Sequence, residues 1–189
     1  MAEHSAALAR QTVEYRKLWP TELPMFREHL HRLDPLTRRM RFGHAVGEEF
    51  IDNYCDTIYG LNTLVYGCFV DGDLRAVAEL RLLNDTWPFE AELAFSVEQF
   101  WQDEGVGTEL MGRILRAARN RGIGKLYMIC LPENGRMQRV AKKYDAQLKY
   151  MQGQIDARVH PAHPDCFSLM HEFLDDTSGF MTYMLDLKH

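Results

Sequence analysis

A short glycine loop at residues 102–107, with the sequence Gln-Asp-Glu-Gly-Val-Gly, constrains the fold more than any other feature of the chain. Residues 91–97 before it resemble a β-strand, and residues 108–121 after it carry apolar side chains at the spacing of one helix face. Glycines let the backbone approach a phosphate closely, and the first turn of a helix offers unpaired N–H groups and the positive end of its dipole. The loop therefore predicts a site for a phosphorylated cofactor.

The composition is that of a soluble globular protein. Apolar residues make up 46% of the 189 residues and charged residues 26%, which argues against disorder. A chain of this length is most simply one domain. We expect a flexible N-terminus over residues 1–11 and a single domain over residues 12–189, with a C-terminal extension from about residue 153. The net charge of −5 disfavours non-specific binding to nucleic acid.

The cysteines and the apolar runs bear on location. The four cysteines are scattered without a C-x-x-C pair, so neither a metal site nor a redox motif is expected, and the thiols fit a reducing cytosol. Residues 2–10 lack the basic start and apolar stretch of a signal peptide. No apolar run approaches the roughly 20 residues that a membrane span needs. We expect a cytoplasmic protein that binds neither a metal nor a membrane.

The first part of the chain predicts one strand and two helices. Residues 12–19 alternate as a strand, and Thr21 stands where it could cap the helix that follows. Residues 36–42 are interpreted as a short basic turn, and residues 47–59 as a second helix.

Three strand-like runs come next, at residues 63–70, 74–83 and 90–97. Asp71-Gly72-Asp73 is a good hairpin turn between the first two. Consecutive strands joined by tight turns form an antiparallel meander.

After the glycine loop, helices and strands alternate. The helix at residues 108–121 leads into a buried-type strand at residues 125–131, and a helix at residues 136–144 follows. A strand–helix–strand unit implies a right-handed crossover and one parallel pair in a mixed sheet. A final strand at about residues 147–159 precedes a C-terminal helix from Ser168.

That C-terminal helix carries large apolar side chains at near-helical spacing: Phe167, Met170, Phe173, Phe180, Met181 and Met184. Such a stripe is more often a core or dimer contact than a ligand site. We expect it to pack over the edge of the sheet.

Three kinds of phosphate loop compete for residues 102–107. A P-loop requires Lys-Ser or Lys-Thr after its glycines, which this segment lacks. A Rossmann fingerprint requires a third glycine where Leu110 stands, and it normally opens the first βαβ unit. The third kind agrees with the motif and with the order of elements. The chain resembles the GNAT superfamily of N-acetyltransferases, whose acyl-CoA loop reads Q/R-x-x-G-x-G/A after the fourth strand and is matched by Gln102, Gly105 and Gly107.

The resemblance covers roughly residues 13–150, by order of elements rather than by identity. It implies an α/β (α+β) GNAT fold, in which a mixed, mostly antiparallel sheet is splayed between its fourth and fifth strands and flanked by helices. In this family the pantetheine arm of acetyl-CoA lies in that gap and pairs with the backbone of the fourth strand.

The resemblance also implies roles for individual residues. Backbone amides from about Val106 to Leu110 would hold the pyrophosphate of CoA. Asn134 would meet the pantetheine arm, and a helix N-cap is a nearly equal reading of it. The implied CoA-binding residues are Phe95, Ser96, Val97, Gln102, Gly105, Val106, Gly107, Thr108 and Asn134.

Two departures from the family pattern concern affinity and catalysis. Asp103 and Glu104 stand where the family often has a basic residue or glycine, and carboxylates beside a pyrophosphate are unfavourable unless they point into solvent. Many family members have a proton-donating Tyr seven residues after the Asn, whereas this chain has Ala141. Tyr144, one turn later, is expected to be a packing residue.

Acetyl transfer to an amine requires a base and donors for an oxyanion. Glu92 is our candidate base, because an acidic residue among apolar strand residues favours a wet cleft, and bacterial protein-lysine acetyltransferases of this superfamily have a Glu base in a similar strand. A solvated residue or a partner for Arg81 is the alternative. Glu79 is the second candidate, or a structural ion pair with an Arg. A backbone N–H near Ser96 would serve the oxyanion.

These features predict an acetyl-CoA-dependent N-acetyltransferase that acts directly on a primary amine, namely a protein lysine, a polyamine or another small amine. The alternative is a non-catalytic acyl-CoA-binding sensor or regulatory domain. Arg38, Arg39 and Arg41 are interpreted as a solvated helix face, with guidance of an acidic substrate as the alternative. Homodimerisation is plausible by superfamily habit.

Overall fold

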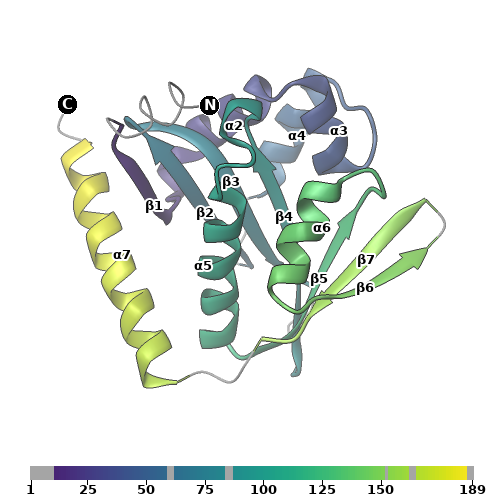
Figure 1. Ribbon diagram of the computed structural model, residues 1–189. Coiled ribbons are helices and arrows are strands. Elements are labelled where there is room, and N and C mark those ends of the chain that lie inside the picture. Colours follow the sequence, from purple (N-terminus) through teal and green to yellow (C-terminus); the bar gives the residue numbers. More distant parts are fainter. Residues whose placement is uncertain (1–10, 59–61, 84–86, 152, 162–164, 187–189) are drawn as a thin grey trace.

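The computed structural model describes residues 11–58, 62–83, 87–151, 153–161 and 165–186 (Figure 1). The segment 1–11, which the sequence predicts to be flexible, lies almost wholly outside these residues. A seven-stranded sheet in the order β1-β2-β3-β4-β5-β7-β6 forms the centre. Its strands are β1 Val13–Lys17, β2 Thr63–Val70, β3 Asp73–Leu82, β4 Phe89–Val97, β5 Ile123–Cys130, β6 Gln147–Met151 and β7 Gln154–Val159.

Helices cover both faces of the sheet (Figure 1). The described helices are η1 Pro20–Glu22, α2 Leu23–Arg32, α3 Pro35–Phe42, α4 Glu48–Ile58, η2 Gln99–Trp101, α5 Val106–Asn120, α6 Gly135–Lys143 and α7 Cys166–Asp186. One apolar core lies between the sheet and α5, and a second lies between the sheet and helices α2 and α4. The mixed sheet flanked by helices confirms the predicted fold class.

The meander β2-β3-β4 agrees with the sequence prediction. Its first turn is a two-residue hairpin in which Asp71 has φ 51° and Gly72 has φ 87°. Positive φ at both central residues matches the right-handed twist of the strands, which is why an Asp-Gly pair suits this turn.

Two local predictions are wrong. Residues 36–42 are not a turn but belong to α3, because the Asp34 carboxylate accepts the Thr37 N–H at 3.0 Å and Pro35 suits the first helical position. Thr21 does not cap α2, since it lies inside η1 and its hydroxyl contacts the Tyr183 hydroxyl at 2.6 Å.

The predicted final strand is two strands. β6 and β7 form an antiparallel hairpin, and Gly153 between them has φ 79°, a left-handed conformation that glycine adopts without strain. β7 returns to pair with β5, so β6 becomes the edge of the sheet.

The pair β4–β5 is the parallel pair of the sheet, and it is short. Only Phe89 to Glu92 of β4 pair with Ile123 to Tyr127 of β5. From Leu93 to Val97, β4 pairs with β3 alone. The two strands therefore separate halfway along β4, which is the splay that the resemblance implied.

Candidate acyl-CoA site

A cavity of about 490 Å³ lies beside the free half of β4, between the glycine loop and α6. It is lined by eight of the nine residues predicted to bind CoA: Phe95, Ser96, Val97, Gln102, Gly105, Gly107, Thr108 and Asn134. The ninth, Val106, does not line the cavity, because its side chain is buried in the apolar core between α5 and the sheet. Residues from three separate segments thus converge on one cavity.

The glycine loop presents the start of α5 to this cavity. Gly105 is the N-cap with φ 82°, and an added Cβ there would meet no atom within 4 Å, so it is the backbone conformation that requires glycine. The N–H groups of Thr108 and Glu109 both donate to the Gly105 carbonyl at 3.0 Å. Helix geometry leaves the preceding N–H groups, those of Val106 and Gly107, free for an anion. Two backbone amides are thus free, fewer than the five from Val106 to Leu110 that are expected from the sequence.

Gln102 holds the loop in place. Its side-chain amide donates to the Val97 carbonyl at 2.9 Å and to the Thr37 hydroxyl at 3.1 Å. Both amide hydrogens are therefore engaged, one to the end of β4 and one to α3. Gln102 lines the cavity, and its contacts fit a residue that positions the loop.

Asp103 is neutralised by the helix across the cavity. Its carboxylate accepts from Arg136 at 2.7 Å and from Arg139 at 3.2 Å, both on α6. These contacts, the hydrogen bond from Arg136 above all, lower the pKa of Asp103. The acidic residue that looked unfavourable for phosphate binding is thus paired with cations that also line the cavity.

Asn134 caps a helix and also lines the cavity, so its position is compatible with both roles expected from the sequence. Its side-chain oxygen accepts the Met137 N–H at 3.1 Å, which caps α6. The residue also lines the cavity, so its amide hydrogens are available to a ligand there.

Strand alternation determines which β4 groups face the gap. Glu98 N–H donates to Arg75 O at 3.0 Å and Leu83 N–H donates to Glu90 O at 2.9 Å, both toward β3. Backbone groups alternate in direction along a strand, so those of Ser96 also point at β3 and those of Phe95 and Val97 point into the gap. A backbone donor for a ligand in the gap is therefore that of Phe95 or Val97.

A second cavity of about 320 Å³ lies at the same split and includes Glu92. Met40, Arg41, Phe95, Asn134 and Met137 line both cavities. Across the described part of the chain, the Glu92 carboxylate forms no hydrogen bond or ion pair, and its register partner Arg81 does not bind it. The site thus has two chambers, with an unengaged carboxylate in the second.

Glu79, the second candidate base, is engaged. It is buried on β3, accepts from Arg41 at 2.8 Å, and also accepts from the Tyr54 hydroxyl. Burial lowers the pKa of Arg41, but Glu79 outweighs burial and raises it. The interpretation of Glu79 as a structural ion pair fits these contacts.

The three arginines of α3 do not form a common solvated face. Arg38 pairs with Glu48 at 2.7 Å, and Arg39 pairs with Glu133 at 2.7 Å. The Arg41 side chain is only 9% exposed and lies where the two cavities meet. Its buried Nε has no hydrogen-bond partner among the described residues.

Sequence reasoning missed His29. The ring is fully buried on α2, with Nε2 2.9 Å from the Ser96 hydroxyl and Nδ1 3.2 Å from the Glu98 carboxylate. Burial lowers the pKa of His29 despite Glu98, so the ring is neutral, accepting from Ser96 and donating to Glu98. This chain of contacts fixes the end of β4 beside the gap. A single His on an apolar helix face gives no sequence signal for it.

Position 141, where many family members have a proton-donating Tyr, does not face the cavity. Ala141 is fully buried in the core. The Tyr144 hydroxyl donates to the Thr108 carbonyl at 2.9 Å, so this residue packs α6 against α5, as expected. A proton for the leaving thiolate would have to come from elsewhere.

The structure bears on metals and membranes only within its described ranges. There, His, Cys, Asp and Glu side chains do not gather in groups of three or more that could hold a metal ion. Nor does any helix in those ranges combine the length and apolar character of a membrane span.

Comparison with known families identifies the class of protein. The model of the acetyltransferase (GNAT) family matches residues 25–145. This match spans more than half of the chain, and the chain therefore belongs to the GNAT acetyltransferase family, as its glycine loop predicts.

Several solved structures share the fold of this chain. The GNAT domain of S. lividans PAT superposes with a TM-score of 0.67 and 20% identity, over 77% of this chain and 89% of that domain. The ribosomal-protein-S18-alanine N-acetyltransferase from Escherichia coli gives 0.61 and 16%, over 82% and 97%. The PaiA N-acetyltransferase from Thermoplasma acidophilum, solved with coenzyme A, gives 0.60 and 16%, over 79% and 99%.

Proposed function

We propose that this protein transfers the acetyl group of acetyl-CoA directly to a primary amine, with Glu92 as the base. The observation that carries the proposal is the pair of cavities that meet where β4 leaves β5. One chamber suits the donor and the other suits the acceptor.

The donor chamber fits coenzyme A. The N–H groups of Val106 and Gly107 would hold the pyrophosphate, and Arg136, Arg139 and Lys143 supply positive charge around the same cavity. The backbone of Phe95 and Val97 would pair with the pantetheine arm in the gap. Asn134 would donate its side-chain amide to that arm.

The acceptor chamber supplies a base. Glu92 would take a proton from the ammonium, directly or through a water, and so expose the amine lone pair. The amine nitrogen then forms a bond to the thioester carbonyl carbon, and the carbon–sulfur bond breaks. A β4 backbone N–H, from Phe95 or Val97, would stabilise the oxyanion formed in between. The nitrogen releases its remaining surplus proton to solvent as the amide forms, and the thiolate takes a proton from solvent, since Ala141 cannot supply one.

The test is a thiol-release assay with acetyl-CoA and a panel of amines that includes a lysine peptide and a polyamine. Glu92→Gln should lower kcat by about 100-fold or more, the usual contribution of a general base. Glu90→Gln is the matched control, because Glu90 lies on the same strand but binds Lys125 at 2.9 Å and lines neither cavity. Unchanged turnover in Glu92→Gln with a good acceptor would show that Glu92 is not the base.

The second candidate function is an acyl-CoA sensor without turnover. The observation that favours it is the buried alanine at position 141, where many relatives have a proton donor. Calorimetry with acetyl-CoA should show binding under both proposals, so an absence of binding contradicts both. Binding without thiol release over the whole amine panel would favour the sensor.

A further inference from the structure

Helix α7 is attached to the rest of the protein through its polar face. The residues that face inward are Ser168, Glu172, Asp175, Asp176, Gly179 and Tyr183, which recur every three or four positions. This face meets α5 and β1. A surface helix usually turns its apolar stripe inward, so α7 is reversed.

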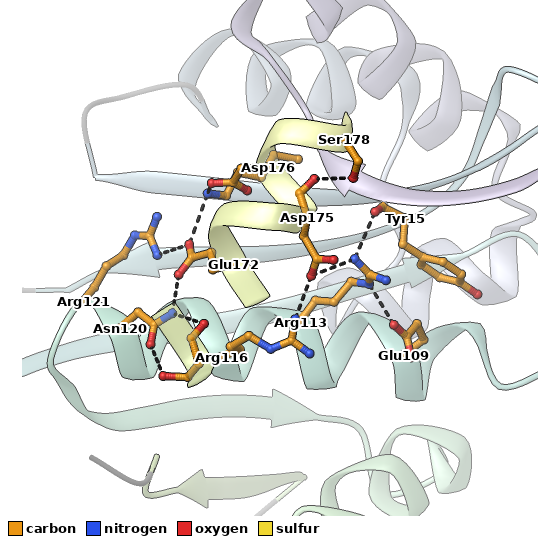
Figure 2. A network of polar contacts seen from close by, with 12 residues as sticks. Tyr15, Glu109, Arg113, Arg116, Asn120, Arg121, Glu172, Asp175, Asp176 and Ser178 are labelled. Atoms are coloured by element: carbon orange, nitrogen blue, oxygen red, sulfur yellow. Dashed lines mark hydrogen bonds and ion pairs between the residues drawn. The ribbon is translucent and has the colours of Figure 1, made fainter. Parts of the chain in front are cut away.

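Ion pairs carry much of this attachment (Figure 2). Glu172 accepts from Arg121 at 2.6 Å and from Asn120 at 2.6 Å. Asp175 accepts from Arg116 at 2.7 Å. In Figure 2 these side chains of α7 point at Arg116 and Asn120 of α5 and at Arg121, which directly follows that helix.

The backbone of α7 also comes close to β1. A Cβ added at Gly179 would lie 2.8 Å from the Cβ of Arg16, so this position has room for glycine only. Near the C-terminal end, Tyr183 and Phe180 contact Trp19, with ring centroids 5.8 and 5.7 Å apart. The polar side of the helix therefore faces the body of the protein.

The opposite side of α7 is apolar and faces solvent. Its exposed side chains are 40 to 72% accessible and comprise Phe167, Met170, Phe173, Leu174, Met181 and Met184. This set is defined here as the outer face. Together these side chains expose apolar area on the order of 700 Å², more than the largest patch on most monomers. The expectation that the stripe packs over the sheet edge is wrong, because the polar face occupies that contact.

The outer face has the spacing of a coiled-coil seam. Phe167, Met170, Leu174, Thr177, Met181 and Met184 are separated alternately by three and four residues. Hydrophobic positions in this pattern are the a and d positions of a heptad, which pack against a second helix of the same pattern. Thr177 is the one polar member of the seam.

We propose that the outer face of α7 binds the outer face of α7 from a second copy of this chain. The seam is self-complementary, as a two-fold symmetric interface requires. Its area on the order of 700 Å² per copy is close to the roughly 800 Å² that each partner contributes to a standard stable interface. The seam itself carries no charged residue, so two copies can meet without burying unpaired charge.

The charges of α7 argue against a lipid surface as the occupant. Helices that lie on membranes are rich in Lys and Arg, which anionic lipids attract. Residues 166–186 contain neither, and they include four acidic residues, Glu172, Asp175, Asp176 and Asp186. A protein seam fits this helix better than a bilayer.

Sedimentation of the full chain tests the proposal. At concentrations on the order of 10 μM the protein should sediment as a species of twice the 22.0 kDa chain mass. The double variant Leu174→Glu with Met181→Glu should raise the dimer dissociation constant by about 100-fold or more, because the charges would be buried in the seam. A wild-type chain that remains monomeric at concentrations on the order of 100 μM would overturn the proposal.

Two further variants keep the test decisive. Thr177→Leu should tighten the dimer by about tenfold by completing the seam, and it does not depend on the folding of the double variant. Tyr150→Glu is the matched control, because Tyr150 is 66% exposed on β6 at the opposite edge of the sheet. Loss of the dimer in Tyr150→Glu alone, or a double variant that still dimerises, would place the contact elsewhere. A monomer that floats with phosphatidylcholine–phosphatidylglycerol vesicles would replace the second copy with a lipid surface.

Discussion

Helices α5 and α7 lie next to each other on one face of the sheet, but they are held by opposite chemistry (Figure 1). α5 buries Leu110, Met111 and Ile114 completely against the strands. α7 turns carboxylates toward the same body and leaves its apolar residues in solvent. α5 is therefore part of the core, whereas α7 is bound to it through ion pairs.

The two kinds of attachment predict that the helices differ in how easily they detach from the sheet. Apolar burial is not directional and depends little on pH, so α5 holds the glycine loop rigidly beside the cavity. Ion pairs that solvent can partly reach contribute less than a buried apolar core and depend on charge and salt. We expect α7 to detach under conditions that leave the sheet and α5 intact.

A substitution in the buried face of α5 should destabilise the protein more than any other change considered. Ile114→Ala removes a fully buried side chain from the core and should lower the free energy of unfolding by about 2–5 kcal/mol. Chemical denaturation of both proteins measures the difference. A loss under about 0.5 kcal/mol, the usual range for a surface residue, would mean that α5 is no better anchored than α7.

A smaller effect is expected on α7. Glu172→Ala leaves Lys17, Arg121 and Asn120 without their shared partner and should cost about 1–3 kcal/mol. Glu172→Gln, which keeps the shape and loses the charge, should cost less. Hydrogen exchange should show the loss in α7 and not in α5. Equal loss of protection in both helices would indicate one cooperative unit.

Protonation of Glu172 at low pH should weaken the attachment of α7, with a smaller effect on stability than Ile114→Ala or Glu172→Ala. Burial raises the pKa of Glu172, but the hydrogen bonds from Arg121 and Asn120 outweigh it and hold the pKa below the ordinary value of 4.5. The folded chain therefore binds this proton less readily than the unfolded chain does. The contribution of Glu172 to stability is complete above pH 4.5 and is lost as the pH falls through the lowered pKa. Tryptophan fluorescence of Trp19, which contacts Tyr183, should report this release in a titration below pH 4.5, and the signal should be absent in Glu172→Gln.

Most of the fold could be predicted from the sequence, because local signals agreed with the long-range pairing. β2 has the predicted bounds, since its strand-forming residues end at an Asp-Gly turn. α3 is hard to predict because a proline often marks the end of a helix, whereas Pro35 is the first residue of a helix that Asp34 caps. The β6–β7 hairpin was missed because its turn depends on one residue, Gly153.

Residues of the candidate site could be predicted only where they belong to a local sequence motif. The glycine loop identified eight cavity residues, because the loop sequence and the order of elements are local information. The contact of His29 with Ser96 joins residues 67 positions apart, and no local pattern encodes it. The sequence reveals the apolar stripe of α7 by its periodicity. Periodicity does not reveal whether the stripe faces the protein or the solvent. That direction depends on the charges of α5, which prefer carboxylates as neighbours.

The separation of β4 from β5 has a thermodynamic consequence. Beyond Glu92 the backbone groups of β4 that face the gap have no strand beside them. A donor molecule that pairs with them takes the place of a missing strand and binds only the folded chain. Occupancy of the gap and resistance to unfolding are then linked, and a donor at 100 times its dissociation constant adds about 2.7 kcal/mol to the folded state. The concentration of donor would thus affect the stability of the folded chain as well as the rate of the reaction.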